Sequence, residues 1–305
     1  MIEIADFGAL GWRSAESAEA RAKACCEQLE RGEILLLRDS TRFLDGVDVE
    51  ALTHLTPSAV AHKNIAYHAD SGEMRGLRRG VDAEPIRKGM ARYQQRAVAS
   101  CASLLAPYAS TWRVELTSFR PLEEQGRRLP RRQRNDLLHI DSFPARPTRG
   151  ARILRCFTNI HPTRARVWKT SNSFKALSKD LLAANLESVT SRASLPWRRL
   201  ARQLAGMARV LGGVRSGDLE YDEFMQSLHD RMKSDLRYRA DAPEFRLEFP
   251  PGATWLVFTD AVPHAVLEGQ YALEQTFFIP LETMRLPDEA PARLIERLAG
   301  RRVTV

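Results

Sequence analysis

The chain has 305 residues, which suits one large domain or two small ones, and its 44% hydrophobic and 28% charged residues are typical of a folded globular protein rather than a disordered one. The formal net charge of +8 favours an anionic partner but does not choose among nucleic acid, an anionic lipid surface and a phosphorylated or carboxylated substrate. No apolar run approaches the roughly 20 residues of a membrane span, and the N-terminus lacks the features of a secretory signal. We therefore expect a cytoplasmic protein whose four cysteines are reduced and structural.

The N-terminal part of the chain predicts helices. Residues 14–31 are typical of a helix that Ser14 caps and Gly32 ends, and a short strand is expected directly afterwards, over 34–38. A second helix is expected over 85–105, where apolar residues recur with a period near 3.6.

From about residue 110 the pattern changes to short β-rich segments separated by Pro, Gly and Arg clusters. The expected strands fall into two groups: 111–119, 137–143 and 151–160, then 245–249, 253–259 and 272–280. Between the groups, about residues 172–240 are predicted to be helical. This order predicts a mainly β fold with helices, of the α+β class, in which a helical insert separates two halves of a sandwich or barrel within a single domain over residues 1–305.

Three residues of the β-rich segments have the chemistry of a metal site. His139 and Asp141 are two apart in an expected strand, so their side chains point to the same face. His264 follows the strand expected over 253–259. Two imidazoles and one carboxylate form the face that holds Fe(II) in non-haem oxygenases and leaves positions open for a 2-oxo acid and dioxygen. Zinc is the alternative, although the usual paired histidines or clustered cysteines of zinc sites are lacking.

An oxygenase that uses 2-oxoglutarate also needs a cation for the distal carboxylate of this cosubstrate, and arginine binds a carboxylate bidentately. Many enzymes of the superfamily carry this arginine on the strand that follows the distal histidine. Here that strand holds Glu274, Gln275 and Thr276 instead. Gln275 and Thr276 can still donate hydrogen bonds to the carboxylate, but the cation must come from another strand.

Three arginines are candidates for this cation. Arg155 is preferred because its neighbours are apolar, and a buried arginine needs an anionic partner. Arg152 differs from it in parity, so only one of the two can face the site in a regular strand. Arg120, at the end of the strand expected over 111–119, is the second choice, although an ordinary ion pair explains it almost as well.

Longer segments over about residues 32–280 carry a resemblance to a known family. They are Lys63-Asn64-Ile65-Ala66-Tyr67, Thr117-Ser118-Phe119-Arg120-Pro121, His139-Ile140-Asp141-Ser142-Phe143-Pro144, residues 152–160, Arg166-Val167-Trp168 and His264. In these segments the chain resembles the Kdo hydroxylases, iron- and 2-oxoglutarate-dependent dioxygenases that act on 3-deoxy-D-manno-octulosonic acid (Kdo) in the inner core of lipopolysaccharide.

The resemblance implies hydroxylation of Kdo at its 3-position to give Ko, with Fe(II), 2-oxoglutarate and O₂ as the reagents and a Kdo-containing lipid A or its precursor as substrate. It implies a double-stranded β-helix, a jelly-roll and cupin-like core. It also implies substrate contacts at Asn64, Tyr67, Arg166 and Trp168, where Arg166 meets an anion and Trp168 stacks on a sugar face. A surface basic loop and a core tryptophan are the simpler explanations for the last two.

Residues 197–211 combine spaced apolar residues with four arginines, so they suit a basic amphipathic helix on the anionic inner face of the inner membrane. A helix packed on the barrel is the commoner use of this pattern. Two other functions stay open: an oxygenase of the same superfamily acting on a small metabolite or an amino acid, and a basic nucleic-acid-binding protein, suggested by the arginine-rich run over 127–134. That run is more simply a solvated loop, so we expect no nucleic acid partner. A homo-oligomer is compatible with the sequence.

Overall fold

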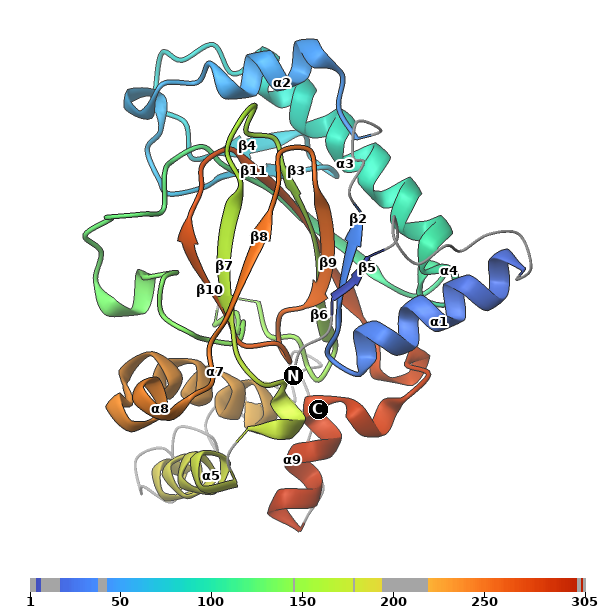
Figure 1. Ribbon diagram of the computed structural model, residues 1–305, viewed down its shortest axis with the longest axis vertical. Coiled ribbons are helices and arrows are strands. Elements are labelled where there is room, and N and C mark those ends of the chain that lie inside the picture. Colours follow the sequence, from blue (N-terminus) through green and yellow to red (C-terminus); the bar gives the residue numbers. More distant parts are fainter. Residues whose placement is uncertain are drawn as a thin grey trace, which may run out of the picture.

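The computed structural model describes residues 4–6, 17–37, 43–144, 146–177, 179–193, 219–300 and 303. Two β-sheets face each other, and helices lie on the outer side of the larger sheet and at one end of the sandwich (Figure 1). The α+β class predicted from the sequence is confirmed. None of the helices in the described ranges is both long and apolar enough to cross a membrane.

The larger sheet has eight strands in the order β1-β2-β9-β6-β11-β5-β3-β4. In that order their bounds are Ile4–Asp6, Ile34–Leu37, Thr254–Phe258, Arg152–Asn159, Ala272–Ile279, Arg113–Arg120, Ile65–His68 and Glu73–Arg75. All neighbours pair antiparallel except β1 and β2, which are parallel. Strand β11 lies between β5 and β6, so the last strand of the chain joins the two strands that bear the candidate arginines.

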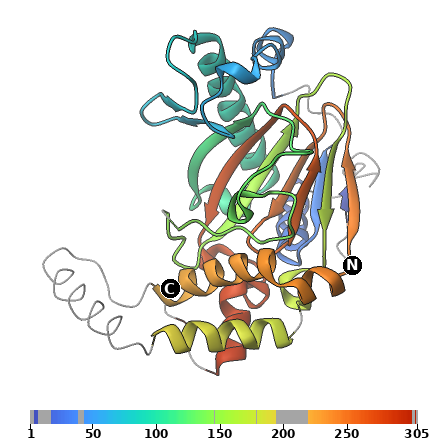
Figure 2. The ribbon, with the colours of Figure 1, turned by 90° about the vertical axis from the view of Figure 1, so that its left-hand side faces the viewer.

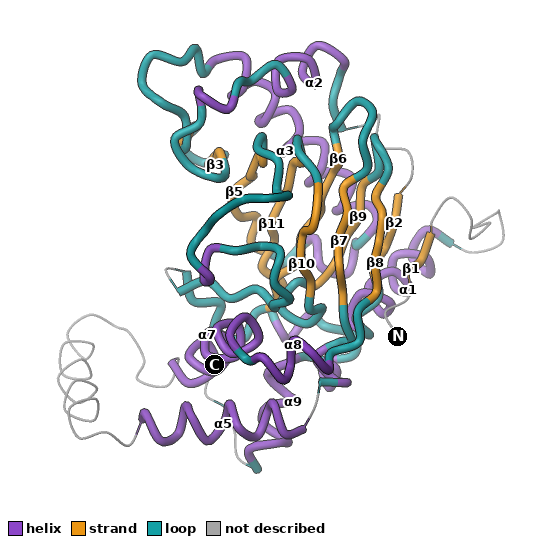
Figure 3. The backbone as a smooth tube through the Cα atoms, turned by 60° about the vertical axis from the view of Figure 1, so that its left-hand side comes forward, coloured by secondary structure: helices purple, strands orange, loops and turns teal. Residues whose placement is uncertain are grey.

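The smaller sheet has the order β10-β7-β8, with bounds His264–Glu268, Arg166–Thr170 and Phe245–Phe249 (Figure 3). Aromatic side chains fill the space between the sheets, and the rings of Phe249 and Trp255 stack with their centroids 3.9 Å apart. Side chains alternate along a strand. Trp255 therefore faces this interior, whereas its neighbour Leu256 faces the helices on the outer side of the sheet.

The N-terminal helices are α1 (Ala18–Glu30), α2 (Gly46–Thr53), α3 (Glu84–Leu104) and α4 (Ala106–Ala109). The cap of α1 is Ser17, whose hydroxyl oxygen accepts from the N–H of Ala20 at 3.1 Å. The prediction that Ser14 caps this helix is wrong, and Ser14 lies outside the described residues. Gly32 ends the helix as predicted, with a φ of +90° that favours glycine.

Between β7 and β8 the described residues form helices: a 3₁₀ turn η3 (Phe174–Ala176), α5 (Lys179–Ala193), α7 (Leu219–Ser234) and α8 (Leu236–Asp241). Together with α9 (Pro291–Ala299) they cover one end of the sandwich (Figure 2). The basic segment 197–211 lies outside the described residues. The remaining short 3₁₀ turns are η1 (Pro57–Ala59), η2 (Arg131–Gln133), η4 (Leu281–Thr283) and η5 (Pro287–Glu289).

The strand predicted over 137–143 does not form as a regular strand. Instead the segment pairs with the start of β10 through a single bridge, in which the N–H of His139 donates to the carbonyl of His264 at 3.1 Å and the N–H of His264 donates back at 2.9 Å. A further bond from the N–H of Asp141 to the carbonyl of Thr259, at 2.8 Å, fixes the next turn of the segment. These three backbone bonds hold the segment in place without a ladder.

Candidate active site

Two histidines and one aspartate meet between the sheets, at the start of β10. His139 and Asp141 come from the extended segment beside β10, and His264 is the first residue of β10. The Nε2 atom of each histidine lies 4.0 Å from a carboxylate oxygen of Asp141. All three side chains are buried, and their ligand atoms lie within 4.8 Å of one another. The structure therefore brings together the three residues that the sequence predicts as metal ligands.

Backbone carbonyls orient both imidazole rings. Nδ1 of His139 donates to the carbonyl of Leu137 at 2.7 Å, and Nδ1 of His264 donates to the carbonyl of Val262 at 2.9 Å. A carbonyl oxygen only accepts, so in each ring the proton is on Nδ1 and the lone pair is on Nε2, which faces Asp141. This is the arrangement by which proteins orient a histidine toward a metal.

The charge states of the three groups also suit a cation. Burial lowers the pKa of both histidines, and it lowers that of His139 well below the ordinary value. Both rings are therefore neutral. Burial alone would raise the pKa of Asp141, but the charge of Arg155 beside it holds that pKa well below the usual range. Neutral imidazoles and an ionised carboxylate are what a divalent metal needs.

The ring of Trp168 packs against His264 and so holds one of the three candidate metal ligands in place. Its ring stacks on the ring of His264 with centroids 5.1 Å apart and planes 21° apart, and its edges meet Phe157 and Trp255. The side chain is only 1% exposed. One face of the ring thus packs on His264, which makes Trp168 a positioning residue, while the residue also lines the cavity described below, so its predicted contact with a sugar stays a prediction.

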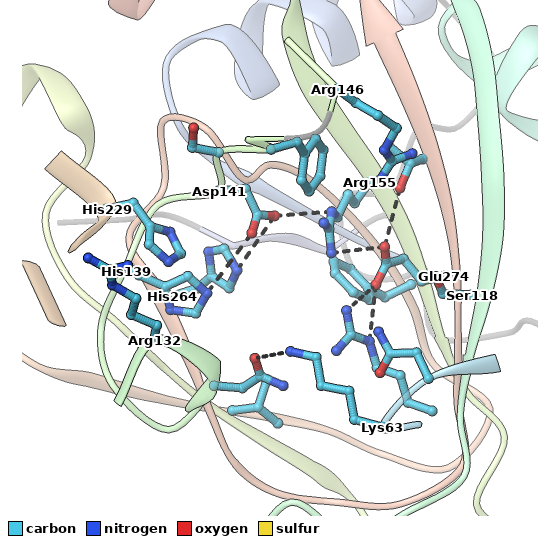
Figure 4. Close-up of a pocket in the computed structure, with 18 of the residues that line it drawn as sticks. Lys63, Ser118, Arg132, His139, Asp141, Arg146, Arg155, His229, His264 and Glu274 are labelled. Atoms are coloured by element: carbon cyan, nitrogen blue, oxygen red, sulfur yellow. Dashed lines mark hydrogen bonds and ion pairs between the residues drawn. The ribbon is translucent and has the colours of Figure 1, made fainter. Parts of the chain in front are cut away.

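A network of buried ion pairs lies beside the three residues. Arg155 on β6 places Nε 3.0 Å from Oδ2 of Asp141 and Nη1 2.8 Å from Glu274 on β11, so that it links the two carboxylates (Figure 4). Arg120 on β5 donates to the same Glu274 through Nε at 3.1 Å and Nη2 at 2.6 Å. Although burial raises the pKa of Glu274, the charges of the two arginines lower it on balance.

A third arginine, Arg166, lies beside Arg155 and Arg120, and the three together are called the arginine wall. Arg166 lies in β7 rather than on a surface loop, is 1% exposed, and donates from Nη1 to the carbonyl of Gly269 at 3.1 Å. Its nearest carboxylate is Glu124 at 3.8 Å. Burial, with the charge of Arg120, lowers the pKa of Arg166 to about 10. The sequence prediction joined Arg166 to the substrate, whereas the structure groups it with Arg120 and Arg155.

These residues line one cavity of about 520 Å³, within the usual size of small-molecule sites. Its described lining holds seven basic side chains and only three carboxylates, so the cavity favours anions. Asn64 and Thr276, two of the predicted contact residues, also line it, and Oδ1 of Asn64 is buried without a partner.

Three predicted site residues face elsewhere, because side chains alternate along a strand. Gln275 points away from its neighbours Glu274 and Thr276 and accepts a hydrogen bond from Thr117 at 2.6 Å. Arg152 lies on the other face of β6 and pairs with Asp260 at 2.7 Å. Tyr67 on β3 packs into a separate apolar cluster beneath α3. The predictions for these three residues are wrong.

Three further residues line the cavity that the sequence did not single out as site residues. Lys63 comes just before β3, and His229 and Lys233 lie four apart on α7. The ring of His229 meets the ring of His139 edge-on, with centroids 5.0 Å apart. The sequence held one indication of this: His229 and Lys233 are four residues apart, and residues with that spacing share a helix face.

Two facing β-sheets with a buried His-x-Asp pair and a distal histidine are typical of the non-haem iron, 2-oxoglutarate-dependent dioxygenases. The chain belongs to this class of enzyme. The family model described as 3-deoxy-D-manno-oct-2-ulosonic acid (Kdo) hydroxylase matches residues 12–302. The chain is a member of the Kdo hydroxylase family, as the resemblance in its sequence indicated.

Solved structures agree with this assignment. The Kdo hydroxylase KdoO in complex with alpha-ketoglutarate and Fe(III) has 31% sequence identity and a TM-score of 0.78, with 99% of this chain and 97% of that chain covered. The apo structure of KdoO has 32% identity and a TM-score of 0.79 over the same shares. A complex of KdoO with succinate and Fe(III) is equally similar, at 31% and 0.78. No curated protein sequence matches the chain. The predicted jelly-roll core is confirmed by these neighbours.

Proposed function

We propose that the protein hydroxylates Kdo at its 3-position to give Ko, in a Kdo-containing lipid A or its precursor, with Fe(II), 2-oxoglutarate and O₂. The family membership supports the substrate class. The observation that carries the chemistry is the buried His139, Asp141 and His264 group beside an arginine-rich wall.

In this proposal His139 and His264 bind Fe(II) through Nε2 and Asp141 binds it through a carboxylate oxygen. Their neutral rings and ionised carboxylate fit that ion. When bound, Fe(II) supplies the activation of O₂ that couples oxidation of the cosubstrate to hydroxylation of the substrate. The chain's own contribution is to orient the metal ligands, bind the anions and exclude water from the site. Trp168 and the carbonyls of Leu137 and Val262 orient the two histidine ligands.

The distal carboxylate of 2-oxoglutarate is assigned to Arg155, with Arg120 and Arg166 beside it. All three guanidinium groups line the cavity, and the hydroxyl of Thr276 faces it from β11. Arg166 has no carboxylate within hydrogen-bonding distance. A carboxylate ligand relieves that imbalance, and the planar guanidinium groups suit it. Arg152 has no place in this assignment because Asp260 occupies it on the other face of the strand.

The experiment that tests the activity uses the purified protein with Fe(II), 2-oxoglutarate, O₂ and Kdo-lipid A, followed by mass spectrometry of the released sugar. We expect one added oxygen on Kdo and one succinate for each product. A panel of small metabolites and amino acids serves as the comparison. Faster, coupled succinate formation with a panel member than with Kdo-lipid A would replace this proposal by the metabolite alternative.

The metal assignment is tested separately with the His139→Ala, Asp141→Ala and His264→Ala variants. Each is expected to lose bound iron and all Kdo-dependent succinate formation, because two of three ligands hold Fe(II) poorly. His161→Ala is the matched control, since His161 is also buried but lies outside the cavity, where its ring accepts from Arg164. Near-normal iron content and turnover in any of the three variants would remove that residue from the metal site.

A further inference from the structure

Two lysines that line the cavity, the buried Lys233 and the half-buried Lys63, form no ion pair with any of the described residues. Lys233 on α7 is 3% exposed, and its Nζ donates to the backbone carbonyl of Arg132 at 3.1 Å. Nζ of Lys63 donates to Oδ1 of Asn135 at 3.4 Å. Among the described residues, no carboxylate oxygen is close enough to either ammonium nitrogen, 4.0 Å or less, to form an ion pair with it. Both charges are therefore held by neutral acceptors alone.

This arrangement is costly for the empty protein. An ionised ammonium group that leaves water is stabilised by an opposite charge, and without one its burial is strongly unfavourable. Two other buried cations of the fold have such a partner: Arg120 pairs with Glu274, and Arg152 pairs with Asp260. Burial lowers the pKa of Lys233 to about 8 although the negative charge of Asp141 opposes this shift, and the positive charge of Lys63 lowers the pKa further, so the two ammonium groups repel each other. An anion between them relieves both costs.

The two lysines come from other elements than the arginines: Lys63 precedes β3 and lies within reach of the charge of Arg120, and Lys233 lies on α7. Lys233 follows His229 by four residues on α7, and the ring of His229 meets that of His139. Figure 4 shows Lys63 reaching into the cavity from the side opposite Arg146. Lys233 therefore lies on the helix whose His229 packs against His139, whereas Arg155 contacts Asp141 and Glu274.

We propose that Lys63 and Lys233 form the subsite for the carboxylate of the sugar-acid substrate, separate from the arginines that hold the cosubstrate. This inference rests on the proposed function, because an acidic sugar is what brings a second carboxylate into the cavity. In a 3-deoxy-2-ulosonic acid the carboxylate is C1, bonded to C2, which is bonded to the reacting C3. An ammonium pair that grips C1 thus fixes the position of C3 through two bonds, next to His139.

The test measures binding, not turnover. Protein loaded with Fe(II) and 2-oxoglutarate under anaerobic conditions is titrated in a calorimeter with the methyl α-glycoside of Kdo and with the 1-carboxamide of the same glycoside. We expect the Lys63→Met and Lys233→Met variants each to bind the carboxylate glycoside about 10- to 100-fold more weakly, the usual loss for a charged hydrogen bond. Their affinity for the carboxamide and for 2-oxoglutarate should stay that of the parent protein.

The controls address folding and charge. Lys175→Met removes an exposed lysine that pairs with Glu289 at 2.6 Å, and it should change neither affinity. Lys233→Arg keeps the charge and should retain part of the preference for carboxylate over carboxamide. Ligand-free Lys233→Met should melt at a higher temperature than the parent, because an uncompensated buried charge has been removed.

Each result has a distinct meaning. Equal weakening of carboxylate and carboxamide binding in the lysine variants overturns the inference, since the lysines then serve the shape of the cavity. Loss of 2-oxoglutarate affinity with unchanged glycoside binding also overturns it and moves the lysines to the cosubstrate. If the parent protein binds neither glycoside nor Kdo-lipid A, the proposed function itself fails and this inference falls with it. A loss specific to the carboxylate ligand supports both.

Discussion

Glu274 stands where many enzymes of this superfamily carry the arginine for 2-oxoglutarate, and replacing it by glutamine tests what it does. Its carboxylate is 2% exposed and accepts from Arg120 at 3.1 and 2.6 Å, while Nη1 of Arg155 lies 2.8 Å away. The arginines lower its pKa, so it is ionised at neutral pH. Glu274→Gln keeps the shape but leaves two buried guanidinium groups with one counter-charge fewer.

The magnitude follows from the burial of this pair. Removing one partner of a buried ion pair costs about 3–5 kcal/mol, and because the amide oxygen of Gln still accepts a hydrogen bond we take the lower end, about 3 kcal/mol. At about 2.1 cal/mol/K per residue, a chain of 305 residues has an unfolding entropy near 0.6 kcal/mol/K, so the melting temperature should fall by about 5 °C. Glu73→Gln, at an exposed pair with Arg75, is the matched control and should leave the melting temperature unchanged.

The assay is thermal unfolding of the metal-loaded protein with and without 2-oxoglutarate. Saturating cosubstrate should raise the melting temperature of Glu274→Gln by more than that of the parent, because the ligand carboxylate replaces the missing counter-charge. A melting temperature within 1 °C of the parent would refute the assigned strength of this ion-pair network. Equal stabilisation of both proteins by 2-oxoglutarate would instead refute its placement at Arg120 and Arg155.

Three further outcomes follow from buried groups. In the folded protein the pKa of Lys233 is about 8, below the ordinary 10.5. Between these two pH values the folded protein binds fewer protons than the unfolded chain, so the stability of the parent should rise with pH across that window. In urea unfolding, Lys233→Met should therefore be about 3 kcal/mol more stable than the parent below pH 8, and this difference should vanish toward pH 10.5. Gly269→Ala places a Cβ 2.8 Å from Cγ of Arg166 at a φ of +126°, so calorimetry should give weaker 2-oxoglutarate binding and an unchanged value would contradict the role of Arg166. Arg152→Met leaves Asp260 buried without its partner and should cost about 3–5 kcal/mol in unfolding free energy while the affinity of the folded protein for 2-oxoglutarate stays the same.

The metal site was predictable from sequence because it depends on local geometry that survives errors in the surrounding elements. His139 and Asp141 were assigned to a strand that does not form, yet an extended segment with one bridge still points both side chains to the same side. His264 was placed after a strand, and it begins one. The two-residue spacing was enough for His139 and Asp141, whereas His264 was predicted from its order along the chain and from the family resemblance.

The arginine wall was predictable only in part. Strand parity separates Arg155 from Arg152, and the same rule applied to β11 separates Glu274 and Thr276 from Gln275. Parity does not say which face is the site, and both faces of this sheet are buried, one under helices and one under the smaller sheet. Polarity therefore gave no direction, and Gln275 was included although it faces Thr117.

The lysines escaped the sequence analysis for a different reason. Their position depends on α7, which comes from the helical stretch between β7 and β8 and packs across the end of the sandwich, far in sequence from β3. No period or spacing links Lys63 to Lys233. Only a folded chain shows that two unpartnered charges share one cavity.

The register of the larger sheet shows how arginines from other strands come close to β11 in this chain, which itself carries no arginine there. Arg155 on β6 lies opposite Thr276, two positions from Glu274, and Arg120 on β5 lies opposite Ala272, two positions on the other side of Glu274. Diagonal neighbours on antiparallel strands are within reach of long side chains. One acid on the central strand thus aligns two arginines from its flanking strands, and in the proposed assignment these arginines supply the cation for 2-oxoglutarate beside the metal ligands. The acid becomes the organising residue, which is why the Glu274→Gln experiment probes the cosubstrate site more directly than removal of any single arginine.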